Sequence, residues 1–312
     1  MKTTNNILLT VLTIALAAAT SPADPLPGEV LKFQQLPLDN LAIQGAIYNG
    51  HDERSIAFAN FNTAGTLLDW TGGYMADDFS DKVSQPVVHV AWWGSYIGGG
   101  APVNPAQQFL ISFETDVPAQ PGAPSHPGTP LLSQIVTAGS LSPGSGTFTE
   151  TLVNGNVPEH LYKYNAELAI PFPEQKDTVY WLKIVALTND PALAWGWHDR
   201  DYTVPDLLAS TAVLPGESDI GPSGPLNPLS VWHFQDDAVV GGLIVTPNAA
   251  GGLTLQQPGF APQNYIDNID GPTGIGAYSK DLAFELYTVP EPATLGVVAL
   301  GGLAALRRRR RA

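Results

Sequence analysis

Short runs of β-favouring residues, each bounded by glycine, proline or another turn residue, limit this chain to a β-rich fold. The runs combine Val, Ile, Thr, Tyr, Phe and Trp, which are typical of strands. The chain has 31 glycines and 28 prolines, which leave little room for a long amphipathic helix. The predicted strands are residues 41–48, 55–61, 87–93, 109–114, 131–136, 147–153, 162–170, 179–187, 230–234, 242–245 and 281–287.

Strands that follow one another without intervening helices predict an all-β fold, an antiparallel β-sandwich of jelly-roll type. Residues 65–73 are rich in glycine and are expected to form a turn and a loop. Residues 205–228 are expected to be irregular, with at most a short helical turn at 206–210. Residues 24–288 are long enough for one large β domain or two smaller ones, and we expect a single domain.

The N-terminus has the pattern of a secretory signal peptide. Lys2 provides a positive charge, residues 7–19 are apolar, and small residues up to Ala23 offer cleavage positions. We therefore expect residues 1–23 to be removed during export by the secretion machinery. The chain contains no cysteine, so it has neither an acylation site nor a disulfide framework.

The C-terminus combines a break, an apolar segment and a basic end. Its parts are Pro290, Glu291 and Pro292, the uncharged residues 293–306, and Arg307, Arg308, Arg309, Arg310 and Arg311. The two prolines exclude a continuous helix or a central strand around Glu291. An arginine cluster stays on the cytoplasmic side of a membrane, so the body would lie outside. The apolar segment is short against the ~20 residues that span a bilayer, which predicts a sorting helix that anchors the chain transiently in the inner membrane.

This ordered tail, residues 289–312, resembles the PEP-CTERM sorting signal of exosortase-processed proteins in Gram-negative bacteria. The resemblance implies export, recognition by a membrane-embedded exosortase, cleavage near the Pro-Glu-Pro motif, and release or attachment at the cell surface. The alternative is an ordinary tail anchor. Segments of the body, among them ADDF at 76–79 and HVAWWGSY at 89–96, are similar to an uncharacterised β-rich domain of secreted proteins from environmental bacteria. That second resemblance implies no activity.

The net charge of the chain limits the classes of molecule that it is expected to bind. The formal net charge is −15, and removal of Lys2, Glu291 and the five tail arginines leaves 8 basic and 28 acidic residues, a charge of −20. Such a body repels phosphate groups, which argues against nucleic acid or anionic lipid as its partner. Neutral or cationic polymers and divalent cations remain compatible with it.

Clustered aspartates suggest calcium as a candidate ligand, because carboxylate oxygens suit this hard cation. The candidates are Asp199, Asp201, Asp236 and Asp237. The alternative, which we favour, is that they are solvated turn residues whose side chains cap backbone amides. The six histidines lack the local spacing of a zinc motif, so the sequence gives no support for zinc.

Aromatic residues suggest a platform on which sugar rings could stack. The candidates are Trp92, Tyr96, Trp195, Trp197 and Trp232. The alternative is that these residues fill the core of a cysteine-free sandwich. Neighbouring residues of a strand point to opposite faces, so Trp92 and Trp93 cannot both belong to one platform.

The expected role is therefore structural or adhesive, in an exopolysaccharide or biofilm matrix at the cell surface. The first alternative is a carbohydrate-binding module. The second is a polysaccharide-acting hydrolase, for which Glu114, Glu150 and Glu167 are the strand-borne carboxylates. No nucleophile motif supports catalysis, and we predict that the protein is not an enzyme.

Overall fold

The computed structural model describes residues 25–37, 52–96, 102–118, 125–154, 160–200, 207–210, 238–249, 251–262 and 281–290. Over these residues the only regular secondary structure is β-strand, which confirms the all-β prediction. The strands are β1 (Val30–Gln35), β2 (Asp52–Arg54), β3 (Ile56–Phe61), β4 (Leu67–Phe79), β5 (Val87–Tyr96), β6 (Gln108–Val117), β7 (His126–Ala138), β8 (Thr147–Asn154), β9 (Leu161–Phe172), β10 (Tyr180–Thr188), β11 (Trp195–His198), β12 (Val239–Pro247), β13 (Leu253–Gln256), β14 (Phe260–Pro262) and β15 (Phe284–Thr288).

The strands form one hydrogen-bonded sheet in the order β1-β15-β5-β9-β8-β7-β6-β10-β3-β4-β12-β13. β11 joins β2 to the end of β5, and β14 pairs with β12. Two pairs are parallel, β10 with β3 and β7 with β8. The sheet is therefore mixed, which corrects the expectation of a wholly antiparallel arrangement.

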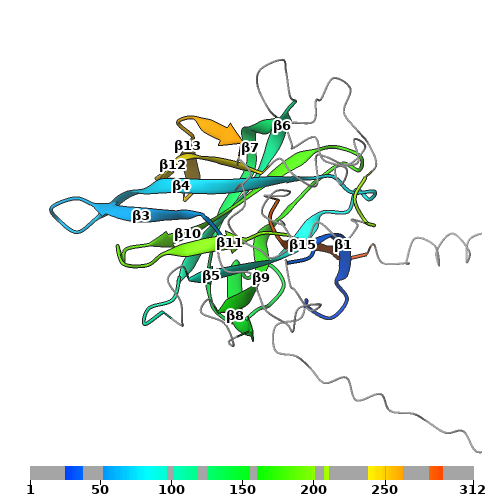
Figure 1. The fold of residues 1–312 in the computed structure, drawn as a ribbon, viewed down its shortest axis with the longest axis horizontal. Coiled ribbons are helices and arrows are strands. Elements are labelled where there is room, and N and C mark those ends of the chain that lie inside the picture. Colours follow the sequence, from blue (N-terminus) through cyan, green and yellow to red (C-terminus); the bar gives the residue numbers. More distant parts are fainter. Residues whose placement is uncertain are drawn as a thin grey trace, which may run out of the picture.

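The sheet curves so that its distant strands enclose one aromatic core. The Phe79 ring on β4 lies 5.8 Å from Phe33 on β1 and 6.3 Å from Phe284 on β15. The Trp92 ring on β5 lies 5.1 Å from Phe109 on β6. These strands are far apart in the sheet order, so their inner faces pack against one another as the layers of a sandwich do. In the view of Figure 1, β3 and β4 lie above β5 and β8.

The prediction of a turn and a loop at residues 65–73, made from their glycines, is wrong. Most of these residues belong to β4. A side chain at Gly72 would place its Cβ 2.2 Å from the carbonyl oxygen of Ile56 and 2.6 Å from Cα of Ala57. The glycine thus allows β3 and β4 to approach closely. Glycines inside a closely packed strand give a sequence the same glycine-rich composition as a turn, so composition alone does not distinguish the two.

Several other elements differ from the sequence prediction. The strands β1, β2, β11, β13 and β14 were not expected, and residues 207–210 carry a bridge from Ala209 to Asp81 in place of a helical turn. The predicted strands at 41–48 and 230–234 lie outside the described residues.

Candidate functional site

The tryptophans proposed as a sugar platform lie inside the protein. Trp92, Trp195 and Trp197 are 0 % exposed and Tyr96 is 4 % exposed. Trp92 stacks on Tyr164 with ring centroids 5.2 Å apart. A sugar ring cannot reach a fully buried indole, so the platform hypothesis is wrong for these four residues. Trp232 lies outside the described residues.

The indoles of Trp195 and Trp197 are instead anchored by hydrogen bonds within the core. Trp195 Nε1 donates to the Tyr164 hydroxyl at 3.1 Å, and Trp197 Nε1 donates to the Ala283 carbonyl at 2.9 Å. These bonds satisfy the polar edge of each indole, as burial requires. Their role is to fix the packing of β11 against β9 and against the segment just before β15.

Tyr96 also serves the interior. Its hydroxyl donates to Glu150 Oε2 at 2.5 Å and accepts from the backbone N–H of Ala106 at 3.1 Å. Burial and the charge of Glu150 raise the pKa of Tyr96 above its usual value, and burial raises the pKa of Glu150. The phenol therefore remains a proton donor, and it ties β5 to β8 and to the segment before β6.

Of the four aspartates proposed for calcium, only Asp199 lies within the described residues. Asp199 is buried, 1 % exposed, and forms a backbone bridge with Leu282. Asp201, Asp236 and Asp237 lie outside the described residues, so their convergence on Asp199 stays a prediction.

The three glutamates considered for hydrolysis each contact a different partner. Glu114 accepts from Lys183 Nζ at 2.8 Å, and Glu150 accepts from the Tyr96 hydroxyl. Glu167 Oε1 lies 2.8 Å from His89 Nδ1. These interactions give each carboxylate a structural partner, and the absence of enzymatic activity stays a prediction.

A Ser, Asp and His also meet, in an order unlike that of a catalytic triad. Asp52 accepts from Ser95 Oγ at 2.6 Å and lies 2.9 Å from His198 Nδ1. In a triad, His lies between the nucleophile and the Asp, so that it can remove the nucleophile's proton. Here Asp52 lies between the other two and links β2, β5 and β11.

One cluster of possible ligands was missed from sequence. The ligand atoms of Glu29, His89 and Glu167 all lie within 4.8 Å of one another. His89 Nδ1 is 2.8 Å from Glu167 Oε1 and 3.3 Å from Glu29 Oε2. His89 and Glu167 are 78 residues apart in sequence but directly opposite in the β5–β9 register. No local spacing could have revealed them.

Electrostatics within this cluster favour a charged imidazole. Burial alone would lower the pKa of His89, but hydrogen bonds with Glu167 and Glu29 outweigh burial and raise the pKa to about 9. Burial also raises the pKa of Glu167. In the absence of another cation, the histidine therefore compensates the two carboxylates by holding a proton.

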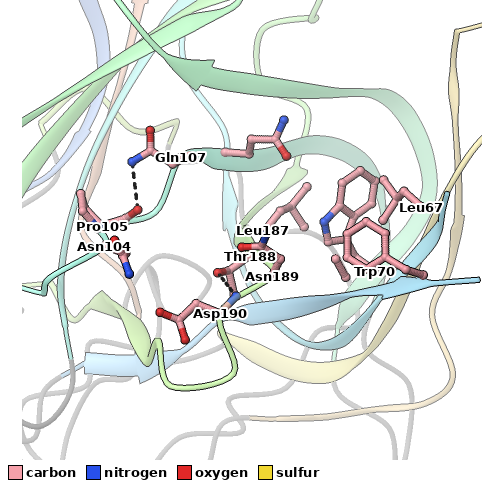
Figure 2. A pocket seen from close by; sticks show the side chains of 12 residues that line it. Leu67, Trp70, Asn104, Pro105, Gln107, Leu187, Thr188, Asn189 and Asp190 are labelled. Carbon is pink, nitrogen blue, oxygen red and sulfur yellow. Dashed lines mark hydrogen bonds between the residues drawn. The ribbon is translucent and has the colours of Figure 1, made fainter. Parts of the chain in front are cut away.

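A surface pocket of about 360 Å³ lies where the end of β10 meets β3, β4 and the segment before β6. Its size suits a small organic ligand. Figure 2 shows Trp70 on one side and Gln107 on the other, with Asp190 near the rim. The lining residues are Ala59, Phe61, Leu67, Trp70, Asn104, Pro105, Gln107, Gln108, Leu187, Thr188, Asn189 and Asp190.

The lining of this pocket is aromatic and neutral-polar. Phe61 is 51 % exposed, whereas Trp70 is buried, at 7 %. Gln107 Nε2 donates to the Pro105 carbonyl at 3.0 Å, and Asp190 Oδ1 accepts from the Ala192 N–H at 2.9 Å. Among the described lining residues, Asp190 alone carries a charge. The pocket thus offers ring faces, amides and one carboxylate, and its described lining provides no basic group for an anion.

Comparison with known proteins accounts for the two parts of the chain separately. Residues 288–311 match the PEP-CTERM protein-sorting motif, which places the chain in the class of exported proteins processed by an exosortase. Residues 31–238, more than half of the chain, match a family described as Domain of unknown function (DUF7901). The chain belongs to that family. No curated protein and no solved structure matches it significantly.

These matches confirm the sorting motif and the uncharacterised body. Pro290 is the last described residue of the tail, and Glu291, Pro292 and Arg307 to Arg311 lie outside the described residues. Within the described part of the chain, no helix has the length and hydropathy to cross a membrane. The predicted signal peptide and transient anchor stay predictions.

Proposed function

We propose that this protein is delivered to the cell surface or the extracellular matrix, where it has a structural or adhesive role in exopolysaccharide. The sorting motif at residues 288–311 supports delivery by an exosortase. The excess of acidic over basic residues, 29 against 14, favours a neutral or cationic polymer over an anionic one.

The observation that carries the adhesive role is the pocket at the end of β10. A sugar ring has an apolar face and a rim of hydroxyls, and it is recognised by an aromatic face together with amide or carboxylate groups. The exposed ring of Phe61 and the side chains of Gln107, Gln108 and Asp190 supply this combination. The carbohydrate-binding alternative thereby moves from the buried tryptophans to this pocket, and the ligand is one or two residues of a neutral polysaccharide.

Replacing Phe61 with alanine is expected to weaken binding to the producer's own polysaccharide about fivefold, because a stacking ring contributes about 1 kcal/mol. Binding is measured by affinity electrophoresis or calorimetry with the isolated polymer. Phe260→Ala is the matched control, since Phe260 is also exposed, at 39 %, but does not line the pocket. Equal affinity in Phe61→Ala and wild type would remove the pocket from the adhesive role.

Sorting predicts a change in the termini of the mature protein. In cells with the exosortase, intact mass and terminal sequencing are expected to show a chain that ends near Pro290. In cells without the enzyme, the tail through Arg311 is expected to remain. An uncleaved tail in both strains would contradict exosortase processing and would make the protein a membrane-anchored one.

A further inference from the structure

We propose that Glu29, His89 and Glu167 form a binding site for one first-row divalent metal ion, with zinc as the preferred ion. The site is separate from the pocket at the end of β10, and it does not depend on the role proposed for that pocket. It lies on the outer face of β5 and β9, beneath the segment that precedes β1.

The first support is the convergence of the three donor atoms. One imidazole nitrogen and two carboxylate oxygens lie within 4.8 Å of one another, although they come from three separate segments. The nitrogen of His89 is 2.8 Å from one oxygen and 3.3 Å from the other. Ligands bound about 2.0–2.2 Å from a tetrahedral zinc ion lie about 3.4 Å from one another, so the 3.3 Å contact already fits and the 2.8 Å contact would lengthen by about half an ångström to admit the ion.

The second support is the orientation of His89. Its other ring nitrogen, Nε2, lies 3.2 Å from Asn165 Oδ1. Metal-binding histidines commonly donate this second N–H to an oxygen, which fixes the tautomer and the ring. With Nε2–H directed at Asn165, the Nδ1 lone pair points toward the two glutamates. Asn165 is therefore a positioning residue for the site.

The third support is the balance of charge. The side chains of Glu29 and Glu167 are only 4 % and 2 % exposed, and two carboxylates in such an environment require compensation. Lys163, four residues before Glu167 on β9, donates to Glu285, at 2.9 Å. In the described part of the chain, His89 is thus the one cationic partner shown for both glutamates. A divalent ion would compensate both charges while the histidine is neutral.

The donor set selects the kind of ion. An imidazole with two carboxylates suits zinc, manganese or iron, and zinc binds most strongly of these in the general order of affinities. Calcium takes six to eight oxygen ligands and does not favour nitrogen, so it fits this site poorly. The remaining coordination positions would be filled by water.

Glu29 is held ready for this role by its own turn. Its Oε2 accepts the backbone N–H of Leu26 at 2.9 Å, and its backbone N–H donates to the Leu26 carbonyl at 3.0 Å. A metal ion bound to Glu29 would tie the segment before β1 onto β5 and β9. Binding should therefore raise the thermal stability of the whole domain.

The test uses the exported protein purified from expressing cells, treated with a chelator and then titrated with zinc chloride by calorimetry. We expect one zinc ion per chain, a melting temperature several degrees higher with zinc than with the chelator, and no comparable effect of calcium chloride. Cobalt chloride gives a second readout, because a bound Co²⁺ ion in a site of low coordination shows visible absorption bands.

Two variants connect the binding to these residues. Glu29→Gln keeps an oxygen acceptor for the Leu26 N–H and is expected to fold, but zinc should bind at least tenfold more weakly. Glu167→Gln should do the same. Glu150→Gln is the matched control, since Glu150 is a partly buried carboxylate outside the cluster, and its zinc affinity should equal that of wild type. Absence of zinc binding in wild type, or equal binding in all variants, would overturn the proposal in favour of a cluster held by a proton alone.

Discussion

Lys183→Met is expected to reduce the free energy of unfolding by about 3–5 kcal/mol, because it would leave a buried carboxylate without its cation. Lys183 Nζ donates to Glu114 Oε1 at 2.8 Å, and both side chains are 0 % exposed. The ammonium also lies 3.8 Å from the centroid of the Tyr74 ring. Burial lowers the pKa of Lys183 to about 8, although the charge of Glu114 acts in the opposite direction. Urea denaturation followed by fluorescence measures the loss.

The double variant Lys183→Met with Glu114→Gln provides the control. It removes the uncompensated charge of the Glu114 carboxylate and keeps a polar side chain in contact with Gln257. In the wild-type protein, Gln257 Nε2 donates to both oxygens of Glu114 at 3.0 Å. Its loss of stability should be clearly smaller than that of Lys183→Met alone. Equal losses in the two variants would show that the lysine stabilises the protein by packing rather than by its charge.

Trp92→Ala is expected to reduce the free energy of unfolding by about 3–5 kcal/mol, because it leaves a cavity in the core. Trp92 is fully buried and packs against the rings of Tyr164, Phe109 and Phe148, which come from three different strands. Thermal and urea denaturation should both register the loss. At a temperature where the variant is still folded, its affinity for polysaccharide should be unchanged.

Phe61→Ala should show the opposite pattern, because Phe61 is half exposed on the pocket surface. Its stability should change by no more than about 0.5 kcal/mol, as is usual for surface positions. If Trp92→Ala lost affinity while Phe61→Ala did not, the assignment of one residue to the core and the other to the pocket would be wrong.

The alternation of residues predicted the central strands well. The expected strands at 87–93, 109–114, 162–170 and 179–187 correspond to β5, β6, β9 and β10, of which the first three extend a few residues further and β10 is shifted by one residue. Buried strands with long apolar runs have a strong local signal. β4 was missed because Gly72 and Gly73 lie inside it, although the close approach of β3 requires a glycine only at position 72.

The candidate sites were harder to predict, for reasons that differ from residue to residue. Trp92 and Trp195 are equally compatible with a binding platform or with a core, because a sequence does not reveal which face of a strand is covered. The Glu29, His89 and Glu167 cluster forms only through strand pairing between distant segments. The pocket likewise depends on the meeting of β3, β4 and β10, and no local motif marks it.

β15 ends at Thr288, just before the sorting tail, and it pairs with β1 on one side and β5 on the other. If the mature protein is attached through its C-terminus, tension along the tail acts on a strand bonded along both edges. Inter-strand hydrogen bonds lie across the strand direction, so this pull would shear many of them at once rather than open them one by one. The attachment point would then resist mechanical load better than a frayed terminal segment could.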